Sequence, residues 1–302
     1  MKALVISGGG SKGAFAGGVA QYLIEERKKN YDLFIGTSTG SLLVCHLALG
    51  KVEKIKKIYT SVNQDSIFNH CPFTIKSKHG TETIGIHHFN VIKNFLRGRK
   101  TFGESENLRS LIKETLTKEE FNTLKYSKKE VLITVSNLSL NQVEYKSIRD
   151  HNYEEFCEWI WISCNYIPFM TLQKKNGCEY ADGGLGSMVP IEEAVKNGAQ
   201  EVDAIVLQTE ITQLNRMPSI NPFSLLTNMF AFMLDRIEAQ NIKIGKFVAS
   251  NNNAIINFYY TPTVLTTNSL IFDKEKMTKW WQSGFVFAKG KNEETSQLEN
   301  ET

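Results

Sequence analysis

YDLFIGTSTGSLL, residues 31–43, carries an apolar run into a glycine-flanked serine and then into a second apolar run. The first run has the length of a buried strand, and residues 39–50 have the character of a helix. Between them, Gly36, Ser38 and Gly40 form the pattern Gly-x-Ser-x-Gly. This pattern is typical of a nucleophile at a sharp strand-to-helix turn, although a helix-capping serine in an ordinary turn is the alternative.

Strands and helices are also predicted to alternate on both sides of this turn. A strand at 2–7 precedes a glycine loop at 8–13 and a helix at 14–29. This alternation, with short connections, predicts an α/β fold whose central sheet is mostly parallel and flanked by helices. We expect one domain over 1–290 and a polar, disordered tail over 291–302. Further elements are predicted as strands at 130–138, 142–148, 202–209 and 254–262, and helices at 154–163, 191–199, 222–248 and 273–290.

The composition excludes several classes of protein. A net charge of +3 in 302 residues, without a basic stripe, gives no indication of a nucleic-acid partner. The 5 cysteines are odd in number and include no Cys-x-x-Cys, which argues against a disulfide framework and favours a reducing compartment. Because no signal-peptide core or membrane-length apolar run is seen, we expect a cytoplasmic protein with transient membrane association.

The glycine loop allows three interpretations. In the first, Gly8, Gly10 and Gly13 match the dinucleotide-binding pattern. That pattern also requires an acidic residue at the end of the second strand to bind the ribose, but Ser38 lies there instead. A tight structural turn is the second interpretation. In the third, the consecutive glycines let backbone N–H groups converge into an oxyanion hole, which a serine nucleophile nearby would require.

The histidines do not supply an ordinary catalytic triad. In α/β-hydrolases the histidine follows the nucleophile and the acid along the chain, yet no histidine here lies beyond His151. His46 follows Ser38 by eight positions, on the helix that leads away from it. A partly buried carboxylate can take the serine proton instead. Asp182, in YADGGLG, is the best candidate, and an ordinary Asp-Gly turn is the alternative.

In combination these motifs resemble the patatin-like phospholipase family, in its bacterial type, over roughly residues 1–210. The resemblance implies a lipid acyl hydrolase with a Ser–Asp dyad, a glycine-rich oxyanion loop, and neither metal nor cofactor. Two departures are Ser7, where plant members have Asp, and residues 167–170, where the family more often shows Pro-Gly. The resemblance rests on SGGGSKGAFAGGV (7–19), GTSTGSLL (36–43), NLSLNQVEYKSI (137–148), ISCNYIPFM (162–170) and DGG (182–184).

The resemblance also implies a role for individual residues. Ser38 is the expected nucleophile and Asp182 the expected base. Gly9 and Gly10 are the expected oxyanion donors, and Lys12 occupies a position where the family has Arg or Lys, so we expect it to contact substrate. The residues expected to shape the loops are Gly8, Gly13, Gly36, Gly40 and Gly183.

The expected function is therefore a serine hydrolase of the phospholipase A or lysophospholipase type that forms an acyl-enzyme on phospholipid or another acyl-ester lipid. Peripheral membrane contact is expected with such a substrate. Three alternatives stay open: a carboxylesterase or acyltransferase on smaller esters or thioesters, a nucleotide-binding protein using Gly8–Gly13, and a catalytically silent lipid-binding protein.

Three other features carry weaker signals. Residues 51–130 are polar and mixed, and they suggest helices and long loops that could form a cap. The Phe- and Met-rich segment 222–234 and the pair Trp280 and Trp281 suggest core packing, with lipid contact as the alternative. Five His and Cys residues lie close together in sequence, but their spacing matches no standard metal site. We therefore expect these histidines to lie in loops and to bind no metal. The five residues are His70, Cys71, His79, His87 and His88.

Overall fold

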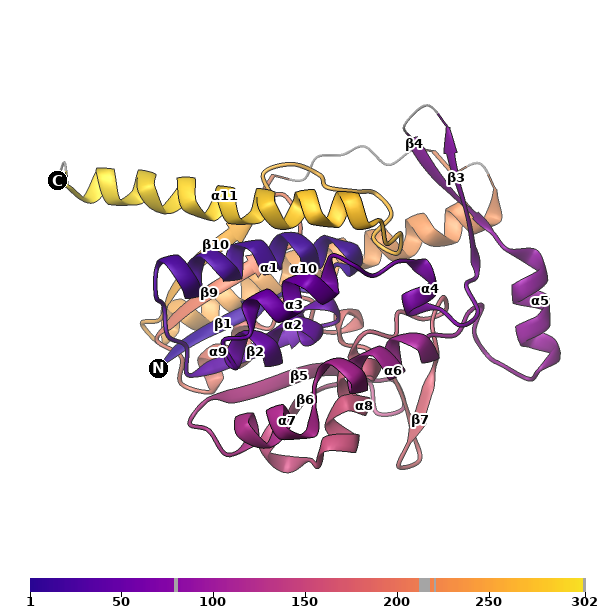
Figure 1. The fold of residues 1–302 in the computed structure, drawn as a ribbon, viewed down its shortest axis with the longest axis horizontal. Coiled ribbons are helices and arrows are strands. Elements are labelled where there is room, and N and C mark those ends of the chain that lie inside the picture. The colour runs from indigo at the N-terminus through magenta and orange to yellow at the C-terminus, as the bar shows by residue number, and fades with distance from the viewer. Residues whose placement is uncertain (79–80, 212–217, 220, 301–302) are drawn as a thin grey trace.

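A central eight-stranded sheet organises the chain, and helices cover both of its faces (Figure 1). The computed structural model describes residues 1–78, 81–211, 218–219 and 221–300. The strands lie in the order β10-β9-β1-β2-β5-β8-β7, and β6 pairs with β5. From β10 to β5 all neighbours are parallel, whereas β6, β8 and β7 are antiparallel to the strands beside them. The strands are β1 (Lys2–Ile6), β2 (Leu33–Thr37), β5 (Glu130–Asn137), β6 (Gln142–Ser147), β7 (Gln173–Lys175), β8 (Cys178–Asp182), β9 (Glu201–Val206) and β10 (Ile255–Tyr260).

The apolar sequence of β1 explains why helices cover both faces of the sheet. Successive side chains of a strand point to opposite faces, so a strand that is apolar throughout needs cover on each side. Leu4 and Ile6 belong to the core under α1, α2, α8 and α11, while Ala3 and Val5 belong to the core under α9 and α10. The predicted α/β fold with a mostly parallel sheet is thus confirmed. These helices are α1 (Gly13–Gln21), α2 (Thr39–Ala48), α8 (Tyr153–Ser163), α9 (Ile191–Lys196), α10 (Pro222–Asn251) and α11 (Lys274–Asn300).

The C-terminal helix α11 packs along α1 and differs from expectation at its end. Trp281 is buried there and donates its indole N–H to Gln21 Oε1 at 2.8 Å, while Trp280 is half-buried against the same core, so core packing is the interpretation that holds for both. The helix continues to Asn300, so residues 291–300 are helical where a disordered tail was predicted. Extending an existing helix avoids the cost of nucleation, which lets a polar segment of ordinary propensity remain helical.

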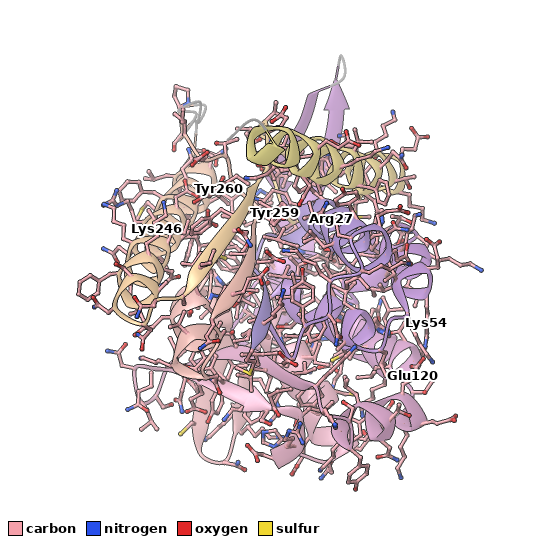
Figure 2. The ribbon with its side chains drawn as sticks, turned by 90° about the vertical axis from the view of Figure 1, so that its left-hand side faces the viewer. Arg27, Lys54, Glu120, Lys246, Tyr259 and Tyr260 are labelled. Atoms are coloured by element: carbon pink, nitrogen blue, oxygen red, sulfur yellow. The ribbon has the colours of Figure 1, made fainter. Side chains whose placement is uncertain are left out.

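Residues 51–130 form the most irregular part of the fold. The prediction of helices there is correct, but a two-stranded antiparallel hairpin, separate from the main sheet, was missed. Figure 1 shows the hairpin projecting from the body of the molecule beside α5. Nearer the sheet, Lys54 of α3 contacts Glu120 of α7 at 2.6 Å, and both are labelled in Figure 2. The elements are α3 (Val52–Tyr59), α4 (Gln64–Ile67), β3 (Phe73–Lys78), β4 (Thr81–Ile86), α5 (His88–Leu96), α6 (Glu106–Thr115) and α7 (Lys118–Lys125).

Candidate active site

Ser38 lies at a strained turn between β2 and α2. Its backbone has φ +53° and ψ −118°, a conformation that residues with a side chain rarely adopt. The turn is tight enough that a Cβ on Gly40 would lie 2.3 Å from Ile6 O, and one on Gly36 would lie 2.4 Å from the Gly40 carbonyl carbon. Only glycine fits at both positions. The Gly-x-Ser-x-Gly segment therefore has the geometry that a nucleophile elbow requires.

The structure brings Ser38 and Asp182 together. Ser38 Oγ–H donates to Asp182 Oδ2 at 2.6 Å, and the N–H of Gly184 donates to Asp182 Oδ1 at 2.7 Å. Asp182 is the last residue of β8 and is buried. Burial raises the pKa of Asp182 to about 7, against the two hydrogen bonds, which lower it. The carboxylate therefore contacts the hydroxyl while its pKa lies close to neutral pH, as a general base requires.

The side chain that contacts the Ser38 hydroxyl is a carboxylate and not an imidazole. In the part of the chain that the structure describes, no histidine hydrogen-bonds to Ser38 or to Asp182. His46 lines the same cavity from α2, but burial lowers its pKa to about 4, and its Nδ1 has no protein partner among the described residues. The buried imidazole is therefore neutral at physiological pH.

The glycine loop lies next to the elbow. A Cβ on Gly8 would lie 3.2 Å from Ser38 Cβ, and the Gly8 N–H is already donated to Met188 O at 3.2 Å. Gly10 has a positive φ of +56° and is pressed against Ser269 O, which a Cβ would approach to 2.2 Å. Among the described residues, the N–H groups of Gly9 and Gly10 have no protein acceptor. These two N–H groups are therefore the candidate oxyanion donors of the loop.

A cavity of about 1030 Å³ opens at this edge of the sheet, and Ser38, Asp182 and the glycine loop all line it. The lining from α2, α3, α6 and α8 is mainly apolar, with Leu42, Ile55, Ile58, Leu108, Ile112 and Ile160. The lining from α10 is mixed. It includes the apolar residues Phe223, Ala231, Leu234 and Ile242 and the polar residues Thr227, Asn228, Asp235, Glu238, Lys243 and Lys246.

A model of patatin-like phospholipases matches residues 4–195. The chain belongs to the patatin-like phospholipase family. The matched segment holds the glycine loop, Ser38 and Asp182. Because the family acts on lipid esters, membership supports lipid acyl hydrolysis as the general class of activity.

Other comparisons add little to this assignment. A search of curated proteins returned no match. Among solved structures, VipD from Legionella pneumophila is similar to this chain with a TM-score of 0.49 and 14% identity. The alignment covers 96% of this chain and 66% of VipD, so the chain spans slightly less than two thirds of that protein. A likeness at this level carries no argument about activity or partners.

Two residues that the sequence analysis gave no role hold the backbone of the elbow. Ser163, at the end of α8, accepts the Ser38 N–H at 2.9 Å and donates to Thr134 O at 2.6 Å. The thiol of Cys164 donates to Ser38 O at 3.1 Å. Both amide groups around the strained serine are therefore fixed. The only sequence signal was their position inside ISCNYIPFM, which carries part of the family resemblance.

Tyr59 of α3 fixes the glycine loop and was also missed. Its hydroxyl donates to Gly10 O at 2.7 Å and contacts Thr39 Oγ1. Tyr59 is buried and lines the cavity. This hydrogen bond restrains the loop that carries the two candidate oxyanion donors, so Tyr59 is a candidate positioning residue. Nothing in the polar segment around it distinguishes it in the sequence.

Lys12 lies at the cavity with two carboxyl groups of α10. Its Nζ donates to Leu207 O at 2.6 Å, and burial lowers its pKa while the Glu238 and Asp235 charges raise it. Burial also raises the pKa of Glu238 to about 8. Asp235 accepts from Gln208 Nε2 at 2.6 Å. Lys12 therefore lies buried beside two carboxyl groups of the protein, and its side chain lines the cavity.

The histidine-rich region has structural contacts. His70 Nδ1 lies 2.9 Å from Glu104 Oε2, and His87 Nδ1 accepts the Asn90 N–H at the start of α5. His79 lies outside the described residues. Within the described ranges, no group of three or more His, Cys, Asp or Glu side chains could hold a metal ion. Over the same ranges, no helix combines the length and apolar character needed to cross a membrane.

Proposed function

We propose that this protein is a serine lipid acyl hydrolase of the phospholipase A or lysophospholipase type, with Ser38 as nucleophile and Asp182 as base. The observation that carries the proposal is the 2.6 Å hydrogen bond from Ser38 Oγ to a buried carboxylate whose pKa is raised to about 7. A carboxylate in that environment can accept a proton at neutral pH without an intervening imidazole.

The first half of the reaction acylates the enzyme. Ser38 Oγ attacks the ester carbonyl carbon as its proton moves to Asp182 Oδ2. The carbonyl oxygen becomes an oxyanion, which accepts hydrogen bonds from the Gly9 and Gly10 N–H groups. When the intermediate collapses, the bond to the alcohol oxygen breaks, and that oxygen takes the proton from Asp182. The alcohol leaves, and the acyl group stays on Ser38.

The second half returns the enzyme to its starting state. Asp182 accepts a proton from a water molecule as the water oxygen attacks the acyl-enzyme carbonyl. The same two amides stabilise the second oxyanion. Collapse breaks the bond to Ser38 Oγ, which recovers its proton from Asp182, and the fatty acid leaves. No proton acceptor beyond Asp182 is needed in either half.

The cavity favours a lipid over a small ester. Its apolar lining on α2, α3, α6 and α8 can bury an acyl chain, and the polar side chains that α10 contributes can face a head group. A short ester would leave most of the roughly 1030 Å³ unfilled. Because apolar contact area contributes binding free energy, long-chain substrates should be preferred over short ones.

A lipid panel tests the proposal. Purified protein is incubated with phospholipids, lysophospholipids and triacylglycerols, and products are identified by mass spectrometry. We expect release of free fatty acid from phospholipid or lysophospholipid by the wild type and none by Ser38→Ala. Hydrolysis restricted to short-chain esters, or acyl transfer without free fatty acid, would favour the esterase or acyltransferase alternative.

A further inference from the structure

Helix α5 has one face packed on the protein and one apolar face in solvent. Val91 and Asn94 are buried on the inner side. Phe89, Ile92 and Leu96 are 71%, 57% and 84% exposed. The spacing of three and four positions between these three residues puts them on one stripe of the helix. An exposed stripe of large apolar side chains is typical of a surface that binds another protein or a membrane.

The segment that carries this stripe is rich in basic residues, two of which border the stripe. Residues 69–101 contain six Lys and Arg residues and one Glu, in a chain whose net charge is only +3. Lys93 lies on α5 and Arg97 directly follows its last residue, and both line a shallow hollow together with the three apolar residues. An apolar stripe bordered by cations matches the chemistry of an anionic lipid surface.

The same segment leads into the candidate active site. Figure 1 shows α5 and the β3–β4 hairpin together at one end of the molecule, near the start of α10. Phe73 of β3 and Ile84 of β4 line the cavity that contains Ser38. Phe73 also packs on Phe223 of α10, with ring centroids 6.4 Å apart. A surface docked through α5 would therefore lie next to elements that form the cavity wall.

The first half of α10 presents a second exposed apolar face at this end. Phe223 and Thr227 line the cavity. Side chains at other positions of the same turns point to solvent and are 51% to 61% exposed. These are Leu225, Met229, Phe232 and Met233. The part of the sequence richest in Phe and Met thus contributes both to the cavity and to an exposed surface beside it.

We propose that the stripe Phe89, Ile92 and Leu96, with Lys93 and Arg97 at its border, docks the protein on anionic membranes. The exposed face of α10 extends this docking surface. The inference rests on the proposed function, since it identifies the surface from which the enzyme draws its lipid. Docking buries apolar side chains in the interface, and the cations add attraction to anionic head groups.

Vesicle flotation tests the docking surface. All proteins carry Ser38→Ala so that the vesicles stay intact, and the vesicles contain phosphatidylcholine alone or with phosphatidylglycerol. We expect Phe89→Ser with Leu96→Ser to lower the partition coefficient by about tenfold or more. Lys93→Gln with Arg97→Gln should weaken binding to the anionic vesicles and have little effect on the others. The matched control is Ile255→Ser, because Ile255 is 64% exposed but begins β10, an edge strand of the main sheet, and belongs neither to α5 nor to α10.

Hydrolysis by the same surface variants, made with Ser38 intact, separates docking from chemistry. We expect activity on a water-soluble short-chain ester to be unchanged while hydrolysis of vesicle lipid falls. Unchanged flotation of the Phe89/Leu96 variant would overturn the docking proposal, as would a wild type that does not bind anionic vesicles. A wild-type dimer that dissociates in this variant would also overturn it, by making the stripe a contact between copies. If the wild type hydrolyses no ester at all, the proposed function alone is overturned, because flotation does not depend on catalytic activity.

Discussion

Two buried aspartates have opposite surroundings. Asp203 of β9 receives hydrogen bonds from Lys29 Nζ at 2.7 Å, from Tyr31 OH at 2.5 Å and from an asparagine of β10. Asp182 receives hydrogen bonds only from neutral groups among the described residues, the Ser38 hydroxyl and a backbone N–H. One carboxylate is therefore paired with a cation, and the other is not.

This difference separates stability from chemistry. Burial and the Asp203 charge raise the pKa of Tyr31 well above its usual value, so the tyrosine stays a donor to that carboxylate. At Asp203 the buried charge is compensated by Lys29. The contacts of Asp203 with Lys29 and Tyr31 link the segment after α1 to β9. At Asp182 burial acts without a compensating cation and raises the pKa to about 7. We infer that Asp203 holds the fold and that Asp182 accepts protons.

The largest expected effect comes from Asp182→Asn. Removing the base should lower kcat on a long-chain ester by roughly 10²- to 10⁴-fold, because general base catalysis is lost. The folded state should be as stable as the wild type or more so, since a buried uncompensated charge is removed. Steady-state kinetics and urea unfolding of the same preparation check both parts. A variant with near wild-type kcat would contradict the role of Asp182.

The converse variant, Asp203→Asn, should affect stability instead. Breaking this buried ion pair removes the closer carboxylate from Lys29, which keeps Glu201 at 3.2 Å, and should cost up to about 3–5 kcal/mol of unfolding free energy. The kcat of the protein that stays folded should not change. Urea unfolding at neutral pH measures the first effect, and Asp32→Asn, which alters an exposed aspartate, is the control. An unchanged unfolding midpoint would mean that the pair is not structurally important.

The pH dependence should also distinguish the two sites. The pKa of Asp182 is higher in the folded state than in the unfolded chain, where it is near 3.8, so the folded state binds protons more tightly. Its contribution to stability is therefore present below pH 3.8 and is lost as the pH rises through about 7. The loss amounts to about 4 kcal/mol, and Asp182→Asn should not show it. Unfolding of wild type and variant between pH 4 and pH 8 measures the difference, and parallel curves would exclude a raised pKa.

The smallest expected effect is that of Tyr59→Phe. Loss of the hydrogen bond to Gly10 O should loosen the glycine loop, which carries the proposed oxyanion donors, and lower kcat by about tenfold, with KM little changed. Kinetics on a long-chain ester checks this split. Tyr22→Phe is the control, because Tyr22 is also a buried tyrosine but packs against α11 and does not line the cavity. Equal kcat values in wild type and Tyr59→Phe would mean that the loop holds its shape without this contact.

The sequence predicted the features whose backbone geometry demands particular residues. Gly36 and Gly40 mark the elbow because no other residue fits there, and the strands around them are apolar because both sheet faces are covered. Asp182 could be named because it ends a strand beside Gly183 and Gly184 and no histidine follows.

The remaining features depend on packing between distant segments. Tyr59 reaches the glycine loop from a helix 49 positions away in sequence, and the sequence around it carries no motif. The β3–β4 hairpin was missed because its strands are rich in Lys and Thr and lie outside the main sheet. Asp203 and Lys29 are 174 positions apart, and no local pattern indicates that they pair.

The pH dependence of labelling by a fluorophosphonate probe tests the central claim most directly. The account predicts that the wild type gains one adduct, on the peptide that contains Ser38, at a rate that rises with pH through a midpoint near 7. Ser38→Ala should not be labelled, and Asp182→Asn should react slowly without that midpoint. An adduct on another residue, or the same rate and pH profile in wild type and Asp182→Asn, would contradict it.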